Sequence, residues 1–276
     1  MISLLPNVSM RRICRVLEIS RSTLYSGTKE SEKQTVQIDS VLEGKIKTLI
    51  LAHPTFGYRR IWAILRFREG IFINRKTVYR LMKLKGWMVC QRLKTPRPRV
   101  KSSRSVAGES NQRWAMDITH IPVGRDGWAH LVAVIDCHDR ELVGWEFALR
   151  GRAHEAERAI ETACLNRFGT IRPSGKTPVV RSDNGLVFQS RRFRDACHFY
   201  RLKQEFVTPY TPEQNGLIER FFRSLKEECT WQYNFRSFRE AKQIIEKWIE
   251  WYNNLRPHQS LNYLSPFEFK QLQNVA

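Results

Sequence analysis

Three acidic residues, far apart in the 276-residue chain, lie in settings that suit metal ligands. Asp117 lies inside RWAMDITHIPV, Asp183 inside VVRSDNGLVF, and Glu219 follows PYTPEQNGLI; 36 positions separate the last two. The aspartates fall in apolar runs typical of strands, and the glutamate opens a helical stretch. Carboxylate oxygens are preferred ligands of Mg²⁺, and two such ions can clamp the attacking and leaving oxygens of an in-line phosphoryl displacement. The trio therefore predicts chemistry on a phosphodiester.

Each aspartate taken alone also has a structural explanation. The sequence that follows Asp183 is a good turn, in which a carboxylate caps the backbone. Asp117 is harder to explain in this way, because a carboxylate inside an apolar strand is costly unless it has a function. Asp136, in VIDCHDRELVGW, is the chief competitor for a ligand position, but its hairpin-turn context gives it a sufficient structural role.

Two cations follow the glutamate on the same predicted helix. Lys226 comes seven positions after Glu219, about two helical turns, so both side chains share one helix face. A contact with phosphate or a terminal base is its expected role, and a solvated surface cation is the alternative. Arg223 is a weaker candidate for a DNA contact, because at four positions from Glu219 it can simply pair with that carboxylate.

Other polar residues near the three carboxylates can be explained by structural roles. Asn215 and Gly216 precede the glutamate helix and are expected to form a tight start that turns Glu219 toward the metals. His120, three residues after Asp117, is a candidate neighbour of a nucleophilic water, with a hydrogen-bonded structural role as the alternative. His258 has the same two readings.

The elements that must position the carboxylates are predicted from periodicity. Alternating apolar patterns predict three antiparallel strands, WAMDITHIPV, WAHLVAVIDC and LVGWEFAL. A helix over about 154–168, the strand VVRSD, a helix over about 190–200, the strand KQEFVT and a long helix from about residue 214 follow. The last predicted helix, over about 237–253, has a wide apolar face that favours packing on the core.

The N-terminal part of the chain is predicted to be helical and is rich in basic residues. Residues 9–26 resemble a short helix-turn-helix in which Ser20 caps a second helix carrying Arg21, and a two-helix packing hairpin is the alternative. Helices are then predicted over about 38–53, 57–70 and 74–86, the last capped by Asn74. Five cations at their ends and on their polar faces are candidate phosphate contacts, with a solvated basic surface as the alternative: Arg59, Arg60, Arg75, Lys76 and Arg80.

Charge and composition agree with a partner made of nucleic acid. The formal net charge is +20, and residues 1–112 carry 23 Lys and Arg against 7 Asp and Glu. Basic surfaces bind DNA by releasing condensed counterions. The six cysteines form no C-x-x-C pair, so neither a zinc site nor a disulfide framework is predicted. No long apolar run or leader is seen, so we expect a cytoplasmic, nucleoid-associated protein with no membrane partner.

The three acidic motifs, in this order and spacing, resemble the DDE catalytic core of the retroviral integrase superfamily. More narrowly, the chain is similar to the transposases of the IS3 family of bacterial insertion sequences. The narrower resemblance rests on Lys226, on WYNNLRPHQSLNYLSP near the C-terminus, and on HPTFGYRRIWAILR followed by INRKTVYRLMKLKGW upstream. It spans about residues 42–270.

This resemblance implies a fold and an activity. The fold is α/β: a ribonuclease H-like integrase core, with a mixed five-stranded sheet and flanking helices, preceded by a small all-α helix-turn-helix DNA-binding region. The activity is strand cleavage and strand transfer at insertion-sequence ends, by Asp117, Asp183 and Glu219 with two Mg²⁺ or Mn²⁺ ions per site. The partners are double-stranded DNA, as terminal inverted repeats and target, further copies of the chain on that DNA, and an upstream-frame partner or frameshift fusion.

The predicted domains follow from these patterns. They are a partial helix-turn-helix with a bridge (1–36), a helical DNA-binding module (37–93), a basic linker (94–112) and a catalytic domain with a C-terminal helix (113–276). Two other functions stay open at this point. One is a DNA-binding regulator with an inactive core, and the other is a ribonuclease H-superfamily nuclease that cuts without joining.

Overall fold

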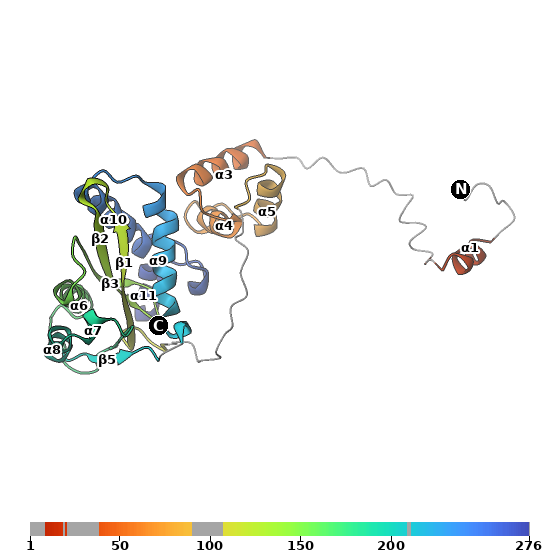
Figure 1. Cartoon of the computed structure of the whole chain (residues 1–276). Helices are drawn as coiled ribbons and strands as arrows, with labels where there is room; N and C mark the ends of the chain where they lie inside the picture. The colour runs from red at the N-terminus through yellow and green to blue at the C-terminus, as the bar shows by residue number, and fades with distance from the viewer. Residues whose placement is uncertain (1–8, 19, 21–38, 90–106, 209–210, 276) are drawn as a thin grey trace. The chain divides into compact units, whose positions relative to one another are not determined.

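The computed structural model describes residues 9–18, 20, 39–89, 107–208 and 211–275 (Figure 1). The chain divides into two compact units, Met1–Gly44 and Lys45–Ala276. In the first unit, α1 spans Met10–Val16, within the predicted helix-turn-helix. The second helix of that motif, with Arg21, lies outside the described residues, as do residues 94–106 of the predicted linker. Both stay predictions.

A five-stranded mixed sheet forms the centre of the larger unit. Its strands are β1 (Arg113–Pro122), β2 (Trp128–Asp136), β3 (Leu142–Ala148), β4 (Val179–Ser182) and β5 (Lys203–Phe206). The spatial order is β3-β2-β1-β4-β5. The first three strands pair antiparallel, whereas β4 runs parallel to both β1 and β5. The antiparallel part needs only hairpins, and the parallel part requires crossover helices.

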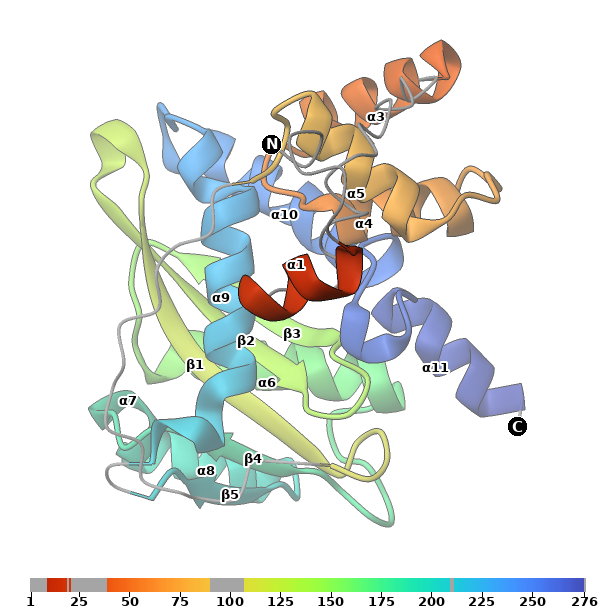
Figure 2. The ribbon, with the colours of Figure 1, turned by 90° about the vertical axis from the view of Figure 1, so that its right-hand side faces the viewer.

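Helices cover both faces of the sheet (Figures 1 and 2). One layer holds α6 (Ala153–Phe168), α7 (Leu186–Gln189) and α8 (Arg191–Phe199); the other holds α9 (Gly216–Glu228) and α10 (Phe238–Asn254). A further helix, α11 (Pro266–Val275), packs on α10. Short 3₁₀ turns lie at η2 (Gly124–Asp126), η3 (Pro212–Asn215), η4 (Thr230–Gln232) and η5 (Gln259–Leu261).

Strand β1 separates two apolar cores. Its even-numbered residues Trp114 and Met116 belong to the core beneath α6 and α8, whereas odd-numbered Ala115 and Ile121 belong to the core beneath α9 and α10. This alternation follows from the two-residue period of a strand, which sends successive side chains to opposite faces. The odd-numbered Asp117 therefore projects on the α9 side.

Three helices precede the sheet: α3 (Ser40–Ala52), α4 (Tyr58–Phe67) and α5 (Arg75–Leu84). Asn74 caps α5 as predicted, because its side chain accepts a hydrogen bond from the Lys76 amide at 2.9 Å. The Trp62 indole donates to the Ile73 carbonyl at 2.8 Å and so holds the connection between α4 and α5.

The predicted order of strands and helices is confirmed in the larger unit. The structure differs at two places. The helix expected over about 190–200 is preceded by the separate short α7, because Ser190 ends α7 and caps α8 by accepting from the Phe193 amide. Helix α11 was not predicted. The five cysteines among the described residues are free and buried, and none of the described helices is long and apolar enough to cross a membrane.

Candidate active site

The register of the parallel strands brings two of the predicted ligands to the same level of the sheet. Arg113 pairs with Val179 and Ala115 with Arg181, a constant offset along β1 and β4. Continued by two residues, this register sets Asp117 beside Asp183, which directly follows β4. Because both are two positions beyond Ala115 and Arg181, both lie on the face that α9 covers.

Helix α9 supplies the third carboxylate. It packs on β1 and β2 and runs along the sheet face (Figure 2). Glu219 lies in its first turn, and Lys226 lies two turns later on the same helix face. Figure 2 labels the strand and helix that carry Asp117 and Glu219, far apart in sequence and side by side in the fold.

Arg181 fixes the start of this helix. Its side chain is 7 % exposed and pairs with Glu205 at 2.9 Å. The same guanidinium donates to the Gln214 carbonyl at 3.2 Å, immediately before α9. The Gln214 side chain in turn accepts from the Thr208 amide at 3.0 Å. Asn215 is buried at the helix start, as expected of a supporting residue, but its side chain makes no capping hydrogen bond.

The pKa of Asp117 is shifted by burial and by the other charged groups of the site. Burial, and then the negative charges of Asp183 and Glu219, raise the pKa of Asp117 from 3.8 to about 6. A hydrogen bond from the Ile118 amide, at 2.7 Å, and the positive charge of Lys226 act in the opposite direction. The charges of Asp183, Glu219 and Lys226 therefore all act on Asp117 in the fold.

The donor set fits a hard divalent cation. It offers carboxylate oxygens, which such cations prefer, and negative charge that Lys226 alone offsets only in part. Across the described parts of the chain, however, no three acidic, histidine or cysteine side chains converge closely enough to enclose an ion. Asp183 is held locally by its turn, because its Oδ1 accepts from the Gly185 amide at 2.9 Å.

Asp136 has the structural role that its turn context predicts. It is fully buried and accepts from the amides of Asn111 and His138, at 2.7 and 2.8 Å, and from the Trp114 indole at 3.2 Å. Asp136 on β2 is the direct cross-strand partner of Trp114 on β1, so its side chain points to the same face as Trp114. That face is covered by α6 and lies opposite Asp117. Nearby, Arg167 pairs with Asp139 at 2.8 Å.

The two histidines also take structural positions. His120 is even-numbered in β1 and packs edge-on against His130, its partner across the β1–β2 ladder, with ring centroids 4.5 Å apart. It therefore projects from the face opposite Asp117. His258 is buried against Tyr252, and burial followed by the charge of Arg256 lowers its pKa well below the usual value. Neither imidazole reaches the carboxylates.

The predicted DNA contacts divide into exposed cations and one half-buried arginine, Arg60. Arg59, Arg75, Lys76 and Arg80 are exposed, which leaves a phosphate contact open to them. Arg60 departs from the expectation of a projecting cation, because it pairs with Glu228 at 2.9 Å and stacks on the Phe56 ring at 4.8 Å.

Arg223 has a second carboxylate within reach on α9. It is exposed and lies 3.9 Å from Glu227, one turn further along the helix. Sequence reasoning considered the earlier carboxylate at four positions and passed over the later one at the same spacing.

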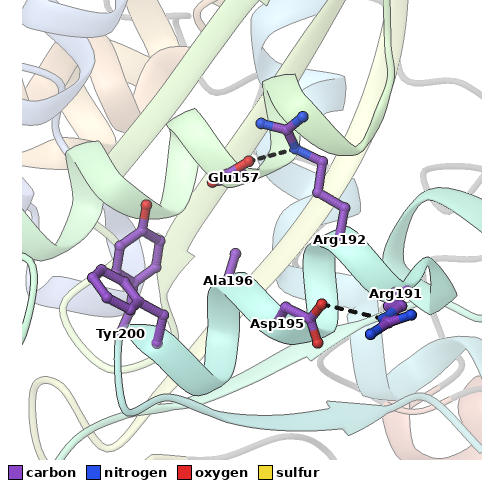
Figure 3. A pocket seen from close by; sticks show the side chains of 7 residues that line it. Glu157, Arg191, Arg192, Asp195, Ala196 and Tyr200 are labelled. Atoms are coloured by element: carbon purple, nitrogen blue, oxygen red, sulfur yellow. Dashed lines mark hydrogen bonds and ion pairs between the residues drawn. The ribbon is translucent and has the colours of Figure 1, made fainter.

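A surface pocket elsewhere is not part of this site (Figure 3). It lies along α8 and α6, under the sheet face opposite Asp117, and Phe199 and Tyr200 form its apolar wall. Its two cations are already paired, Arg192 with Glu157 at 2.7 Å and Arg191 with Asp195 at 3.7 Å. The charge of the pocket is thus satisfied within the protein.

Sequence reasoning missed Arg181 and Arg256. Arg181 supports the start of α9, and Arg256 holds its end through Glu228, at 2.6 Å. A signal existed for Arg181, since an arginine within the apolar strand VVRSD requires a buried partner. For Arg256 no comparable signal exists, because its charged partner Glu228 lies 28 positions earlier in the sequence on another helix.

Comparison with known families agrees with this geometry. Two family profiles, both described as Integrase core domain, match residues 107–212 and 200–266. A third, described as HTH-like domain, matches residues 37–95. The catalytic profiles together cover the sheet, α9 and α10, and the third covers α3 to α5.

Relatives of similar length match nearly the whole chain. One is the insertion element IS407 uncharacterized 31.7 kDa protein of Burkholderia multivorans, 29 % identical over 95 % of this chain and 91 % of that protein. Another is the transposase InsD for insertion element IS2 of Escherichia coli, 28 % identical over 93 % of this chain and 89 % of the relative.

Among solved structures, the fold resembles a chain of the simian T-cell lymphotropic virus intasome in complex with PP2A regulatory subunit B56 gamma. The TM-score is 0.50, the identity 17 %, and the match covers 82 % of this chain and 73 % of that chain. This likeness concerns the fold: a ribonuclease H-like integrase core with a preceding helical domain. The family profiles and the relatives, rather than this structural likeness, show that the chain belongs to the IS3 family of insertion-sequence transposases, which are DNA strand transferases.

Proposed function

We propose that this transposase cleaves DNA at the ends of its insertion sequence and joins the cut strand to a second phosphodiester, with Asp117, Asp183 and Glu219 as one catalytic group. The observation that carries the proposal is the strand register, which continued by two residues sets Asp117 beside Asp183 on the face that α9 covers, with Glu219 in the first turn of that helix. The raised pKa of Asp117, caused by burial and then by the charges of the other two carboxylates, agrees with this arrangement. Carboxylates that repel one another in this way are suited to share divalent cations.

Each residue has a distinct part in this proposal. Asp117 and Asp183 present oxygens from adjacent strands, and Glu219 presents oxygens from the helix above them. Bound Mg²⁺ or Mn²⁺, two per site, would supply Lewis-acid activation and neutralise charge on the phosphodiester. Lys226 contacts a phosphate or terminal base of the end DNA beside the carboxylates, and Arg223 is a weaker candidate for such a contact.

The DNA partners follow from where the positive charge lies. Residues 1–112 hold 23 of the chain's 47 basic residues against 7 of its 27 acidic ones. Exposed Arg59, Arg75, Lys76 and Arg80 are the proposed phosphate contacts of the helical module, and Arg21 is a proposed contact of the N-terminal helix-turn-helix. The proposed substrates are the terminal inverted repeats and target DNA, bound by more than one copy of the chain at the nucleoid. An upstream-frame partner or fusion belongs to the same proposal.

The test is strand joining on labelled DNA that carries the gene's own flanking repeats, with Mg²⁺ or Mn²⁺. Glu219→Gln is compared with Glu227→Gln, the same change about two turns further along the same helix, where the half-buried Glu227 pairs only loosely with Arg223 at 3.9 Å. We expect joined product from wild type and Glu227→Gln and none from Glu219→Gln. Cutting without joining would favour a nuclease, and DNA binding with neither reaction in wild type would favour a regulator.

A further inference from the structure

Two segments that the sequence singles out take no part in the candidate active site. They are residues 53–66, HPTFGYRRIWAILR, and residues 251–266, WYNNLRPHQSLNYLSP. In the structure they pack against each other through aromatic rings. The Trp251 ring lies 5.2 Å from that of His53 and 6.0 Å from that of Phe56, centroid to centroid. The start of α4 is thus seated on the end of α10.

The far end of α4 is attached as well. The Trp62 ring meets the Tyr263 ring edge-on at 5.4 Å. Arg68, just beyond the helix, pairs with Glu268 on α11, with Nη2 to Oε2 at 2.6 Å. The same nitrogen donates to the Leu255 carbonyl at 3.3 Å. Contacts at both ends leave α4 little freedom to pivot on this surface.

Glu228 is the charged centre of the contact. Its side chain is 6 % exposed and accepts from Arg60 at 2.9 Å and from Arg256 at 2.6 and 2.7 Å. Arg256 also donates to Ser224 on α9 at 3.3 Å. One buried carboxylate therefore joins three parts of the fold: α4, α9 and the segment after α10. Burial and the charge of Arg256 lower the pKa of Arg60 to about 10, which still leaves Arg60 charged at neutral pH.

The position of Glu228 on α9 gives this contact a relation to the active site. Glu228 is the last residue of the helix that carries Glu219 in its first turn. Nine residues correspond to about 13 Å along the axis and half a turn around it. Glu219 and Lys226 therefore lie on one side of α9, and Glu228 holds the opposite side. A displacement of α4 is therefore transmitted through Arg60 and Glu228 to the end of α9, the helix that carries Glu219.

We propose that Glu228 is a positioning residue, which with Arg60 and Arg256 locks the helix-turn-helix-like module to α9, so that end DNA held by the module is presented to the three carboxylates in a fixed orientation. The function of this lock rests on the proposed function, whereas the lock itself does not. Misplacement of a substrate by as little as 1 Å can reduce a reaction rate by about a hundredfold. Loss of the lock therefore reduces the rate of joining more than the affinity for end DNA.

The test uses the full chain with Arg60→Met, which removes the bond from α4 and leaves the Arg256–Glu228 pair in place. Lys242→Met is the matched control, because Lys242 lies 4.0 Å from Glu246 in an exposed pair on α10. We expect Arg60→Met to bind end DNA within about threefold of wild type and to join strands at least tenfold more slowly at saturating DNA. Arg60→Lys restores most of the rate, and the control matches wild type.

Amide hydrogen exchange gives a readout that needs no catalysis. Arg60→Met is expected to speed exchange in Tyr58–Phe67 and to leave β2 protected, whereas general unfolding would speed both. Unchanged exchange in Tyr58–Phe67 overturns the lock, even if wild type joins no DNA. Faster exchange with a wild-type joining rate at saturating DNA, or a rate loss explained by weaker binding alone, overturns its role in positioning.

Discussion

Asp117 is expected to destabilise the metal-free protein, and removing its charge is expected to stabilise it. In the unfolded chain its pKa is close to 3.8, whereas in the fold burial and two neighbouring carboxylates raise the pKa to about 6. A difference of about two pKa units corresponds to roughly 3 kcal/mol. The asparagine in Asp117→Asn can still accept the Ile118 amide that now bonds to Oδ1 at 2.7 Å. The variant therefore loses the charge without losing this hydrogen bond.

The sign of the pH dependence follows from linkage. The folded pKa is higher than the unfolded one, so ionisation of Asp117 lowers the free energy of unfolding. This destabilisation is complete above about pH 6 and disappears as the pH falls toward 4. Thermal unfolding in chelator should thus show Asp117→Asn more stable by about 3 kcal/mol, roughly 6 to 12 °C, at pH 7.5, and by about half as much at pH 5. Added Mg²⁺ should stabilise wild type and leave the variant unchanged.

The matched control is Asp136→Asn, on the opposite face of the sheet. Asp136 accepts from Asn111, His138 and Trp114, so an amide group in place of one oxygen sets donor against donor. This variant should be less stable than wild type at both pH values. An Asp117→Asn protein no more stable than wild type at pH 7.5, or a difference that does not shrink at pH 5, would refute the electrostatic account of the site.

Three further substitutions test separate parts of the account. Lys226→Met should reduce joining about tenfold and raise the pKa of Asp117 further, seen as a shifted pH–rate profile, whereas Arg223→Met should leave both nearly unchanged. Arg181→Met should lower the unfolding free energy by about 3 kcal/mol in denaturant titration and reduce joining, because the start of α9 loses its donor and Glu205 keeps only Arg113, at 3.3 Å. Arg167→Met, which removes the cation paired with buried Asp139, should lower stability by about 3 to 5 kcal/mol, with joining at saturating DNA near wild type in the folded fraction.

The sequence was enough to predict the sheet, because strand alternation there agrees with burial. Trp114 and Met116 on one face of β1, and Ala115 and Ile121 on the other, explain why the strand is apolar almost throughout. Helix α11 was missed although a signal was present. The Ser265 hydroxyl accepts from the Glu268 amide, and the Glu268 carboxylate accepts from the Ser265 amide at 2.8 Å, which is a capping box; Pro266 occupies the first helical position.

The three carboxylates of the candidate site could be predicted from the sequence, whereas the ion pairs that hold the surrounding helices could not. Asp117 stands out because a carboxylate within an apolar strand is costly to bury unless it has a function. Asp183 and Glu219 are then identified by their spacing. The role of Arg60 was not predictable, because its partner Glu228 lies 168 positions away and α4 shows an ordinary amphipathic pattern with or without that bond. Local patterns report which face of an element is buried, and they carry no information about which distant charge lies opposite it.

The central claim is that Asp117, Asp183 and Glu219 form one metal site, and the most direct test is a Mn²⁺ titration of the protein followed by electron paramagnetic resonance. The account predicts that wild type and Glu227→Gln bind the ion alike, and that Asp117→Asn, Asp183→Asn and Glu219→Gln each weaken or abolish binding. Equal Mn²⁺ binding by wild type and all three site variants would contradict the claim.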